Sequence, residues 1–361
     1  MLYLASFLFI LLFLFSCSDE FLDTMKEEQA LEKANKESPV SPPVSSSWVN
    51  LGSLATPRSG CIFILADAQY YIYGGEEYAG VRSDFWRYDP ETLGGTLLTS
   101  TGYKTLSAMA YAKSRLYIFG GEDSGGGTLT DLRYYDPSGA SWSAEITTSD
   151  TNGPFAPARS GHAMFAYVDP ADSHTKLYIY GGSSGGTNVA GTVYSLDLDE
   201  PGKPRWSKLA EGPALRNFAS ALVGDKIYVY GGYSSSEARV KDELWVYSIT
   251  DDAWTLLGTM PSSLAAREGA AMAYVGGRIY LYGGSRPSTL ISSVAPTVLN
   301  DLWAYDIPSN TWTQAGEGPG GRAFHRCVAY DGLLILYGGY KYSSGSMVYL
   351  SELWSYTPDT P

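Results

Sequence analysis

The sequence predicts an all-β fold in which six similar four-stranded units close into a ring. A Gly-Gly pair preceded by aromatic and β-branched residues recurs six times along the 361 residues. The composition agrees, because 40 Gly, 29 Tyr and 9 Trp are typical of short strands joined by tight turns. We therefore expect strands, not helices, to form the core.

Each Gly-Gly pair marks the end of the second strand of a unit. Successive pairs lie 46, 61, 50, 52 and 55 residues apart, which leaves room for four strands per unit. Glycine allows positive φ and the close approach of a second backbone, which a side chain would prevent. We predict a structural role for Gly74, Gly75, Gly120, Gly121, Gly181, Gly182, Gly231, Gly232, Gly283, Gly284, Gly338 and Gly339.

The other strands of each unit also have recurrent sequences. The third strand begins at an acidic residue or its replacement, as in DFWRYD from Asp84 and DLWAYD from Asp301. A tryptophan usually follows on the outer strand, and we expect these indole rings to fill the wedge between neighbouring units. The tryptophans with this structural role are Trp48, Trp142, Trp206, Trp254 and Trp312.

The two ends of the repeat region predict how the ring closes. The last unit ends near Pro358, before its outer strand, whereas SSSWVNLG precedes the first unit and belongs to no unit of its own. We predict that residues 46–52 complete the last unit and leave no open sheet edge.

Four strands per unit of about 50 residues are the signature of a β-propeller, and the motifs resemble the kelch repeat. The resemblance covers residues 47–361. It implies a six-bladed kelch-type β-propeller, a repeat protein in which nearly all tyrosines are core residues. Because some kelch propellers are enzymes and fold does not fix function, the function has to be argued from a site.

Residues 1–46 differ in composition from the repeats. Residues 1–15 carry no charge and are fewer than the roughly 20 that span a bilayer, so we predict that residues 1–17 are a signal peptide or a lipoprotein signal. The sequence LFSC resembles a bacterial lipobox, and cleavage, lipidation of Cys17 and an uncleaved anchor remain open. Residues 18–46 are acidic and then rich in Pro and Ser, which predicts a disordered tether. We expect an extracytoplasmic protein, secreted or at the cell surface.

The charge and the scarce metal-binding residues exclude several partners. With 25 Lys+Arg against 38 Asp+Glu, the net charge of −13 argues against binding to nucleic acid. Three Cys and three His give no metal motif, so we expect neither a metal nor another cofactor. Whether Cys61 and Cys327 form a disulfide stays open. We expect a monomer that contacts a membrane only through an uncleaved or lipidated N-terminal segment.

Basic residues open the inner strands, and we expect them around the mouth of the central channel, on the face that carries the long variable loops. They are Arg58, Lys104, Arg159, Arg216, Arg267 and Arg322, and Glu76 and Glu122 lie on the same rim. Because guanidinium groups match carboxylates, this ring could bind an anionic ligand. The alternative is structural, with each cation binding carbonyl groups of adjacent blades. His162 and His325, in opposite units, are expected to face each other across the channel.

Two functions remain. The first is a non-catalytic binding module that presents the loop-rich propeller face to a protein or glycan ligand outside the cytoplasm. The second is a small-carbohydrate enzyme resembling bacterial sialate mutarotases, whose chemistry needs a carboxylate and an arginine at the channel mouth. No catalytic residue can be named, because the sequence contains no evident nucleophile–base pair.

Overall fold

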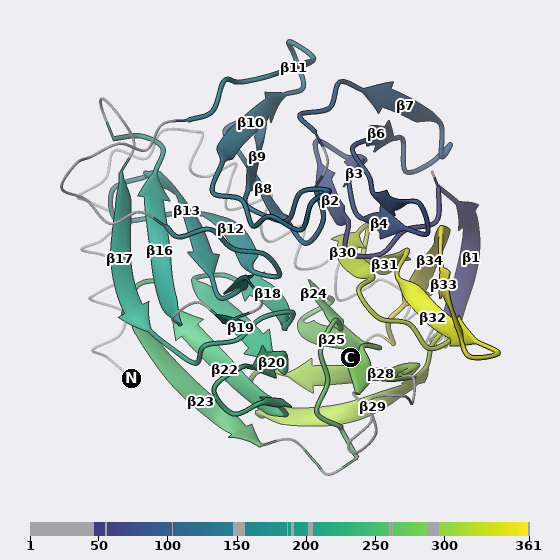
Figure 1. The fold of residues 1–361 in the computed structure, drawn as a ribbon. Helices are drawn as coiled ribbons and strands as arrows, with labels where there is room; N and C mark the ends of the chain where they lie inside the picture. Colours follow the sequence, from purple (N-terminus) through teal and green to yellow (C-terminus); the bar gives the residue numbers. More distant parts are fainter. Residues whose placement is uncertain are drawn as a thin grey trace, which may run out of the picture. The chain divides into compact units, whose positions relative to one another are not determined.

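The computed structural model describes residues 47–359 except 55, 103, 147–155, 186, 189–190, 201–204, 260, 262 and 287–295, and it forms a six-bladed β-propeller (Figure 1). The predicted all-β fold is confirmed. The signal segment with Cys17 and the tether over residues 18–46 lie outside the described residues. The described part of the chain contains no helix with the length and hydropathy needed to cross a bilayer.

Each blade is an antiparallel four-stranded sheet, and four parts of the repeat supply its strands from the channel outward. The inner strands are β2 (Ile62–Ala66), β8 (Ala108–Ala112), β12 (Ala163–Val168), β18 (Ala219–Val223), β24 (Ala271–Val275) and β30 (Arg326–Tyr330). The second strands are β3 (Gln69–Tyr73), β9 (Arg115–Phe119), β13 (Thr175–Tyr180), β19 (Lys226–Tyr230), β25 (Arg278–Tyr282) and β31 (Leu333–Tyr337). The third strands are β6 (Phe85–Tyr88), β10 (Leu132–Asp136), β16 (Thr192–Asp197), β22 (Glu243–Ser248), β28 (Asp301–Asp306) and β34 (Glu352–Thr357). The outer strands are β7 (Gly95–Leu98), β11 (Ser141–Trp142), β17 (Trp206–Glu211), β23 (Ala253–Thr259), β29 (Thr311–Glu317) and β1 (Ser47–Ser53).

The connections between the second and third strands lie on one face of the propeller, which we call the hairpin face. In five blades the connection contains a two-stranded sheet of its own. The hairpin strands are β4 (Glu76–Glu77) with β5 (Gly80–Val81), β14 (Ser183–Ser184) with β15 (Thr187–Asn188), β20 (Tyr233–Ser234) with β21 (Arg239–Val240), β26 (Ser285–Arg286) with β27 (Thr297–Val298), and β32 (Tyr340–Ser343) with β33 (Ser346–Tyr349). The long segments predicted to be variable loops therefore contain regular structure.

The ring closes through β1, as the sequence predicts. Strand β1 pairs antiparallel with β34, and Trp48 lies opposite Tyr356. The sixth blade therefore combines the first described strand with β34, and this pairing gives it four strands like the other blades (Figure 1).

The Gly-Gly pairs join each blade to the next. Gly74 and Gly75 have φ values of 62° and 90°. A Cβ atom on Gly74 would lie 2.0 Å from the carbonyl oxygen of Lys104, and the amide of Gly75 donates a 2.8 Å hydrogen bond to that same oxygen. Only glycine permits this contact between neighbouring blades.

Aromatic rings fill the wedges between blades. Tryptophans of the outer strands pack on the aromatic residue that precedes the Gly-Gly pair of the preceding blade. These contacts are Trp142–Tyr73, Trp206–Phe119, Trp254–Tyr180, Trp312–Tyr230 and Trp48–Tyr282, with ring centroids 4.5 to 5.8 Å apart. The outer strand of blade 1 has no tryptophan. At that seam Tyr337 packs on Phe63, with centroids 5.2 Å apart, and donates a 3.3 Å hydrogen bond to the Leu54 carbonyl.

Candidate functional site

The mouth of the central channel on the hairpin face is built from two stretches of each blade. The first residue after each Gly-Gly pair forms a β-bridge with a residue that lies just before the inner strand. The bridges are Ser59–Glu76, Thr105–Glu122, Ser160–Ser183, Arg216–Tyr233, Glu268–Ser285 and Ala323–Tyr340. These positions surround the mouth and define the candidate site.

Six backbone hydrogen bonds form a closed ring through the residues that directly follow the bridge residues before the inner strands. Its members are Gly60, Leu106, Gly161, Asn217, Gly269 and Phe324, and each amide donates to the carbonyl of the member in the preceding blade over 2.7 to 2.9 Å. All six have φ between 53° and 64°. A Cβ atom on Gly161 would lie 2.2 Å from the side-chain oxygen of Asn217, so glycine in one blade makes room for a larger residue in the next. The ring gives the mouth a rigid backbone frame.

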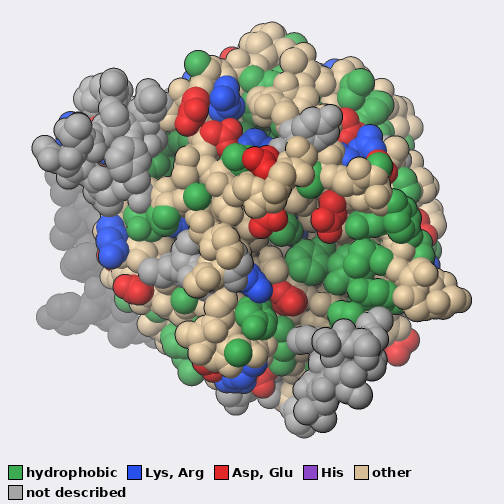
Figure 2. Space-filling view, in the orientation of Figure 1, with side chains coloured by type: hydrophobic (Ala, Val, Ile, Leu, Met, Phe, Trp, Pro, Cys, Tyr) green, Lys and Arg blue, Asp and Glu red, His purple; other side chains and the backbone are tan. Residues whose placement is uncertain are grey.

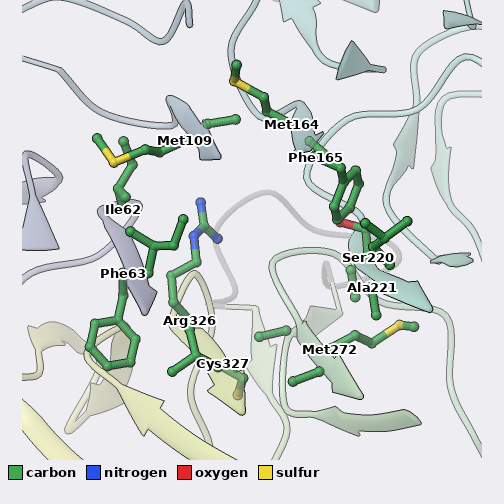
Figure 3. Close-up of a pocket in the computed structure, with 18 of the residues that line it drawn as sticks. Ile62, Phe63, Met109, Met164, Phe165, Ser220, Ala221, Met272, Arg326 and Cys327 are labelled. Carbon is green, nitrogen blue, oxygen red and sulfur yellow. The ribbon is translucent and has the colours of Figure 1, made fainter. Parts of the chain in front are cut away.

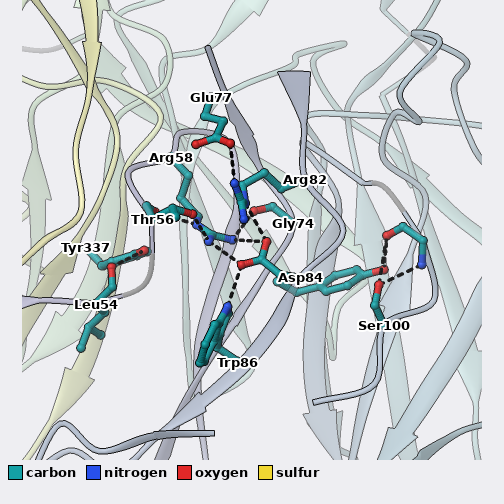
Figure 4. A network of polar contacts seen from close by, with 12 residues as sticks. Leu54, Thr56, Arg58, Gly74, Glu77, Arg82, Asp84, Trp86, Ser100 and Tyr337 are labelled. Carbon is teal, nitrogen blue, oxygen red and sulfur yellow. Dashed lines mark hydrogen bonds and ion pairs between the residues drawn. The ribbon is translucent and has the colours of Figure 1, made fainter. Parts of the chain in front are cut away.

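The predicted ligand-binding arginine of blade 1 is buried within its own blade (Figure 4). The Arg58 guanidinium donates to both carboxylate oxygens of Asp84, at 3.0 and 2.7 Å, and to the carbonyl of Gly74 at 2.9 Å. Its remaining donors bind the carbonyl and hydroxyl of Thr56 at 3.0 and 2.8 Å. Arg58 therefore joins the end of the second strand to the start of the third.

The carboxylate of Asp84 accepts hydrogen bonds from two further side chains. Asp84 accepts hydrogen bonds from Arg82 at 2.8 Å and from the Trp86 indole at 2.6 Å, and Arg82 also pairs with Glu77 (Figure 4). Burial alone would raise the pKa of Asp84, but the hydrogen bonds from Arg58 and Arg82 hold that pKa far below its usual range. The two guanidinium groups therefore favour the charged form of this carboxylate.

Three more members of the predicted ring repeat this arrangement. Each is at most 4% exposed and pairs with the acidic residue that begins the third strand of its blade. The pairs are Lys104–Asp131 at 2.6 Å, Arg267–Asp301 at 2.7 Å and Arg322–Glu352 at 2.9 Å. The cations also bind the carbonyl of the first glycine of the pair, at 3.3, 2.9 and 3.3 Å. Because these charges are buried and neutralised, the mouth is not basic, and the expectation of a basic mouth is wrong.

Blade 3 keeps the arginine but lacks the acid. Arg159 is fully buried and donates to the carbonyls of Gly181 and Pro157 at 3.0 and 3.1 Å. Thr192 occupies the position of the carboxylate, and neither its hydroxyl nor the Arg159 Nη2 atom has a hydrogen-bond partner. Burial lowers the pKa of Arg159 to about 10.

In blade 4 the predicted ring residue is displaced by one position. The carbonyl that accepts the hydrogen bond from the second glycine belongs to Leu215, where the other blades have the basic residue. Arg216 instead bridges to Tyr233 and lies over its ring, 4.6 Å from the centroid. The cation of this blade is Lys241, which donates a 2.6 Å hydrogen bond to Glu237 and lies 2.9 Å from Glu243. The spacing was the available signal, because Leu215 lies 16 residues before Gly231, as Arg58 does before Gly74, whereas Arg216 lies 15 residues before it.

Acidic side chains replace the expected positive charge at the mouth. The described acids there are Glu76, which lies 3.3 Å from Ser59, Glu122, 2.5 Å from Ser160, and Glu268, 3.0 Å from Asn217. Figure 2 shows acidic side chains gathered around the middle of this face. Burial raises the pKa of Glu76, and the charge of Glu122 adds to that effect while the Ser59 hydroxyl opposes it.

Sequence reasoning found Glu76 and Glu122, because both directly follow a Gly-Gly pair, but it missed Glu268. That residue enters from the other side of the bridge, next to the opening Arg267, where the other blades carry small or neutral side chains, or Arg216 in blade 4. The signal in the sequence was an acidic residue at a repeat position where the other blades have none.

An aromatic surface extends from the mouth over the hairpins of blades 6 and 1. It consists of the exposed Tyr78 and the half-buried Phe324, Tyr342 and Tyr349, and the buried Tyr340 packs against it. Tyr78 is 74% exposed and meets Tyr349 edge-on at 5.1 Å, while Tyr340 stacks on Phe324 at 5.8 Å. Figure 2 shows the corresponding hydrophobic area beside the acidic mouth. The repeat pattern assigns nearly all tyrosines to the core and does not distinguish the ones at this surface.

The two histidines of the inner strands do not face each other across the channel. His162 packs edge-on against Phe119 at 5.6 Å, and His325 against Tyr282 at 5.3 Å, so each imidazole lies against the preceding blade. Burial lowers the pKa of both groups well below the usual value, which keeps them neutral. Across the described residues no three His, Cys, Asp or Glu side chains are grouped to hold a metal, and Cys61 and Cys327 are free thiols.

Comparison with known proteins supports the same architecture. The model of the KLHDC2/KLHL20/DRC7 Kelch-repeats domain matches residues 105–339. This chain belongs to the Kelch-repeat β-propeller family. Kelch propellers generally serve as binding modules. The carbohydrate-enzyme alternative needs an arginine available at the channel mouth, but four of the six predicted cations are held in ion pairs within their blades.

The relatives of this Kelch propeller are larger proteins. It is 25% identical over 297 residues to a leucine-zipper-like transcriptional regulator 1 homolog of Drosophila melanogaster, covering 74% of this chain and 28% of that protein. It is 26% identical over 275 residues to Kelch-like protein 40 of Mus musculus, covering 72% and 41%. The chain thus spans less than half the length of these relatives. The solved structure of YjhT superposes with a TM-score of 0.66 at 18% identity, covering 82% of this chain and 94% of that one, which supports the fold alone.

Proposed function

We propose that the hairpin face of this Kelch propeller binds a protein segment that carries both apolar and basic side chains. The observation that carries the proposal is the position of the aromatic surface, directly beside the acidic mouth. Exposed tyrosines supply large contact areas at little conformational cost and are enriched at binding hot spots. Glu76, Glu122 and Glu268 supply the complementary charge for lysine or arginine.

The scaffold suits such a role because the contact groups stand on fixed supports. The ring of backbone hydrogen bonds sets the positions of the mouth residues, and Phe324 belongs both to that ring and to the aromatic surface. A preorganised surface loses little conformational entropy on binding. We further propose that binding takes place outside the cytoplasm, since the apolar segment at residues 1–15 has the composition of a secretion signal.

Selection of peptides from a random display library on the full chain tests this proposal. We expect enrichment of sequences that combine Lys or Arg with aliphatic or aromatic residues. Tyr78→Ala and Tyr349→Ala should each weaken a selected peptide at least tenfold, and added salt should weaken it further because the acidic groups contribute.

Tyr274→Ala is the matched control. Tyr274 is 40% exposed on the inner strand β24, near the end of that strand remote from the hairpins. Its removal should leave binding unchanged. Enrichment of acidic peptides, binding of glycans in place of peptides, or loss of binding in Tyr274→Ala alone would each overturn the proposal.

A further inference from the structure

The central channel encloses a cavity of about 490 Å³ between the six inner strands. Its wall combines apolar side chains, among them Ile62, Met109, Met164 and Met272, with polar ones such as Ser220 (Figure 3). The cavity extends from the backbone ring on the hairpin face, where Leu106 and Phe324 line it, to Tyr111 and Tyr274. A volume of this size is typical of small-molecule sites.

One cationic side chain enters this cavity. Arg326 is the first residue of β30, and Figure 3 shows its guanidinium extending between the inner strands toward Ile62 and Met109. The equivalent residues of the other blades, each paired with the residue before a Gly-Gly pair, are Ile62, Ala108, Ala163, Ala219 and Ala271. The repeat therefore does not require a cation here.

Arg326 resembles Arg159, and differs from Arg58, Lys104, Arg267 and Arg322, in having no acidic partner within the described residues. Its hydrogen bond is a long one, 3.4 Å to the carbonyl of His325. Burial lowers the pKa of Arg326, opposed only by the thiols Cys61 and Cys327. Arg326 is half-buried, and a guanidinium that faces a cavity without a counter-charge would gain from binding an anion.

The charge of Arg326 is felt on the far side of the channel. Burial lowers the pKa of His162 in blade 3, and the charges of Arg159 and then Arg326 lower it further. Blades 3 and 6 are opposite in the ring (Figure 1). The charge of Arg326 also lowers the pKa of His325 in its own blade, so the direction of the side chain into the channel rests on Figure 3.

We propose that the channel binds a small monocarboxylate with an apolar body, whose carboxylate pairs with Arg326. A planar carboxylate can accept two parallel hydrogen bonds from a guanidinium. The methionine and alanine wall favours an aliphatic or aryl body, and methionine adapts to ligands of different shape. One cation balances one negative charge, whereas a dicarboxylate or a phosphate would leave a second charge buried without compensation.

Octanoate is the probe that tests this site. The full chain labelled with ¹⁵N is titrated while the Arg326 Nε–H resonance is followed, with acetate and chloride titrated separately. We expect a saturable shift of that resonance, with octanoate binding at least tenfold more tightly than acetate and chloride. Absence of a shift with octanoate, or equally tight binding of acetate or chloride, would overturn the proposal.

Variants assign the effect to the side chain. Arg326→Met should abolish octanoate binding while melting at or above the temperature of the unmodified protein, because an unpaired charge is removed. Arg326→Lys keeps the charge and should retain weakened binding, which keeps the test valid if the methionine variant does not fold. Arg278→Met is the control, since Arg278 lies 3.9 Å from Asp306 on the second strand of blade 5, outside the cavity wall. Unchanged binding in Arg326→Met, or loss in Arg278→Met, would contradict the assignment.

Discussion

Blades 5 and 3 hold the same buried arginine in different surroundings. In blade 5, Arg267 donates two hydrogen bonds of 2.7 Å to the carboxylate of Asp301. In blade 3, Arg159 donates to the carbonyl of Gly181, and its Cζ atom lies 5.3 Å from the ring centroid of Tyr194. Thr192 occupies the position that Asp301 has in blade 5.

The comparison separates the two roles of the buried cation. Both arginines bind the carbonyl of the first glycine of the pair, so tying the Gly-Gly turn does not require the acid. The acid is needed to compensate the charge, and where it is absent burial lowers the pKa of Arg159 to about 10. Removing one partner of the ion pair in blade 5 should therefore lower the free energy of unfolding more than removing the arginine of blade 3, which has no acidic partner.

The largest effect is expected from breaking the pair in blade 5. Asp301→Asn keeps the side-chain shape but leaves Arg267 buried without a counter-charge, which should lower the free energy of unfolding by about 3–5 kcal/mol. Arg159→Met, which removes a charge that has no acidic partner, should change it by no more than about 1 kcal/mol. Urea denaturation of the two variants measures both values. Similar losses in both variants would show that the acid does not matter.

A smaller loss is expected in blade 4, where the cation comes from the hairpin. Lys241→Met should lower the free energy of unfolding by about 2 kcal/mol, because Glu243 and Glu237 both lose their contact with the ammonium group. Adding Leu215→Arg to that variant restores a cation at the position that the other blades use, and part of the loss should be recovered. Leu215→Arg in the unmodified protein, with Lys241 still present, is the control and should destabilise. A double-mutant cycle in urea gives the coupling energy.

Supplying the missing acid should stabilise blade 3. Thr192→Asp places a carboxylate where Asp301 stands in blade 5, and the charged hydrogen bond to Arg159 should add about 1.5 kcal/mol to the free energy of unfolding. Thr192→Asn has a similar shape without the charge and should add less. A thermal or urea midpoint below that of the unmodified protein for Thr192→Asp would mean that the blade 3 guanidinium cannot reach the acid position.

The smallest effect is in the response to acid. Burial would raise the pKa of Asp301, but the hydrogen bonds and charge of Arg267 lower it overall. A lowered pKa in the folded state stabilises the protein above the unfolded value of about 3.9, and this contribution is lost as the pH falls through the folded value. The difference in free energy of unfolding between the unmodified protein and Asp301→Asn should therefore narrow below about pH 4. A constant difference from pH 6 to pH 3 would exclude this linkage.

Much of the candidate site could be read from the sequence, although its chemistry could not. The basic column was visible because Arg58, Arg267 and Arg322 recur at the same distance before the Gly-Gly pair. Their acidic partners open the third strand, some 26 to 34 residues later, and only the sheet brings that residue beneath the arginine. The sequence therefore located the cations but could not show that they are neutralised.

Blade number, strand order and ring closure were determined by the sequence alone. Each depends on a local pattern that repeats, namely the Gly-Gly pair, the alternation within a strand, and Trp48 placed ahead of the first unit. The features that depend on contacts between blades were decided by the tertiary structure. The one-residue shift at Leu215, the backbone ring at the mouth, the aromatic surface and the direction of Arg326 all depend on contacts between blades. A repeat specifies its own fold through neighbours in the chain, whereas these features depend on neighbours in space.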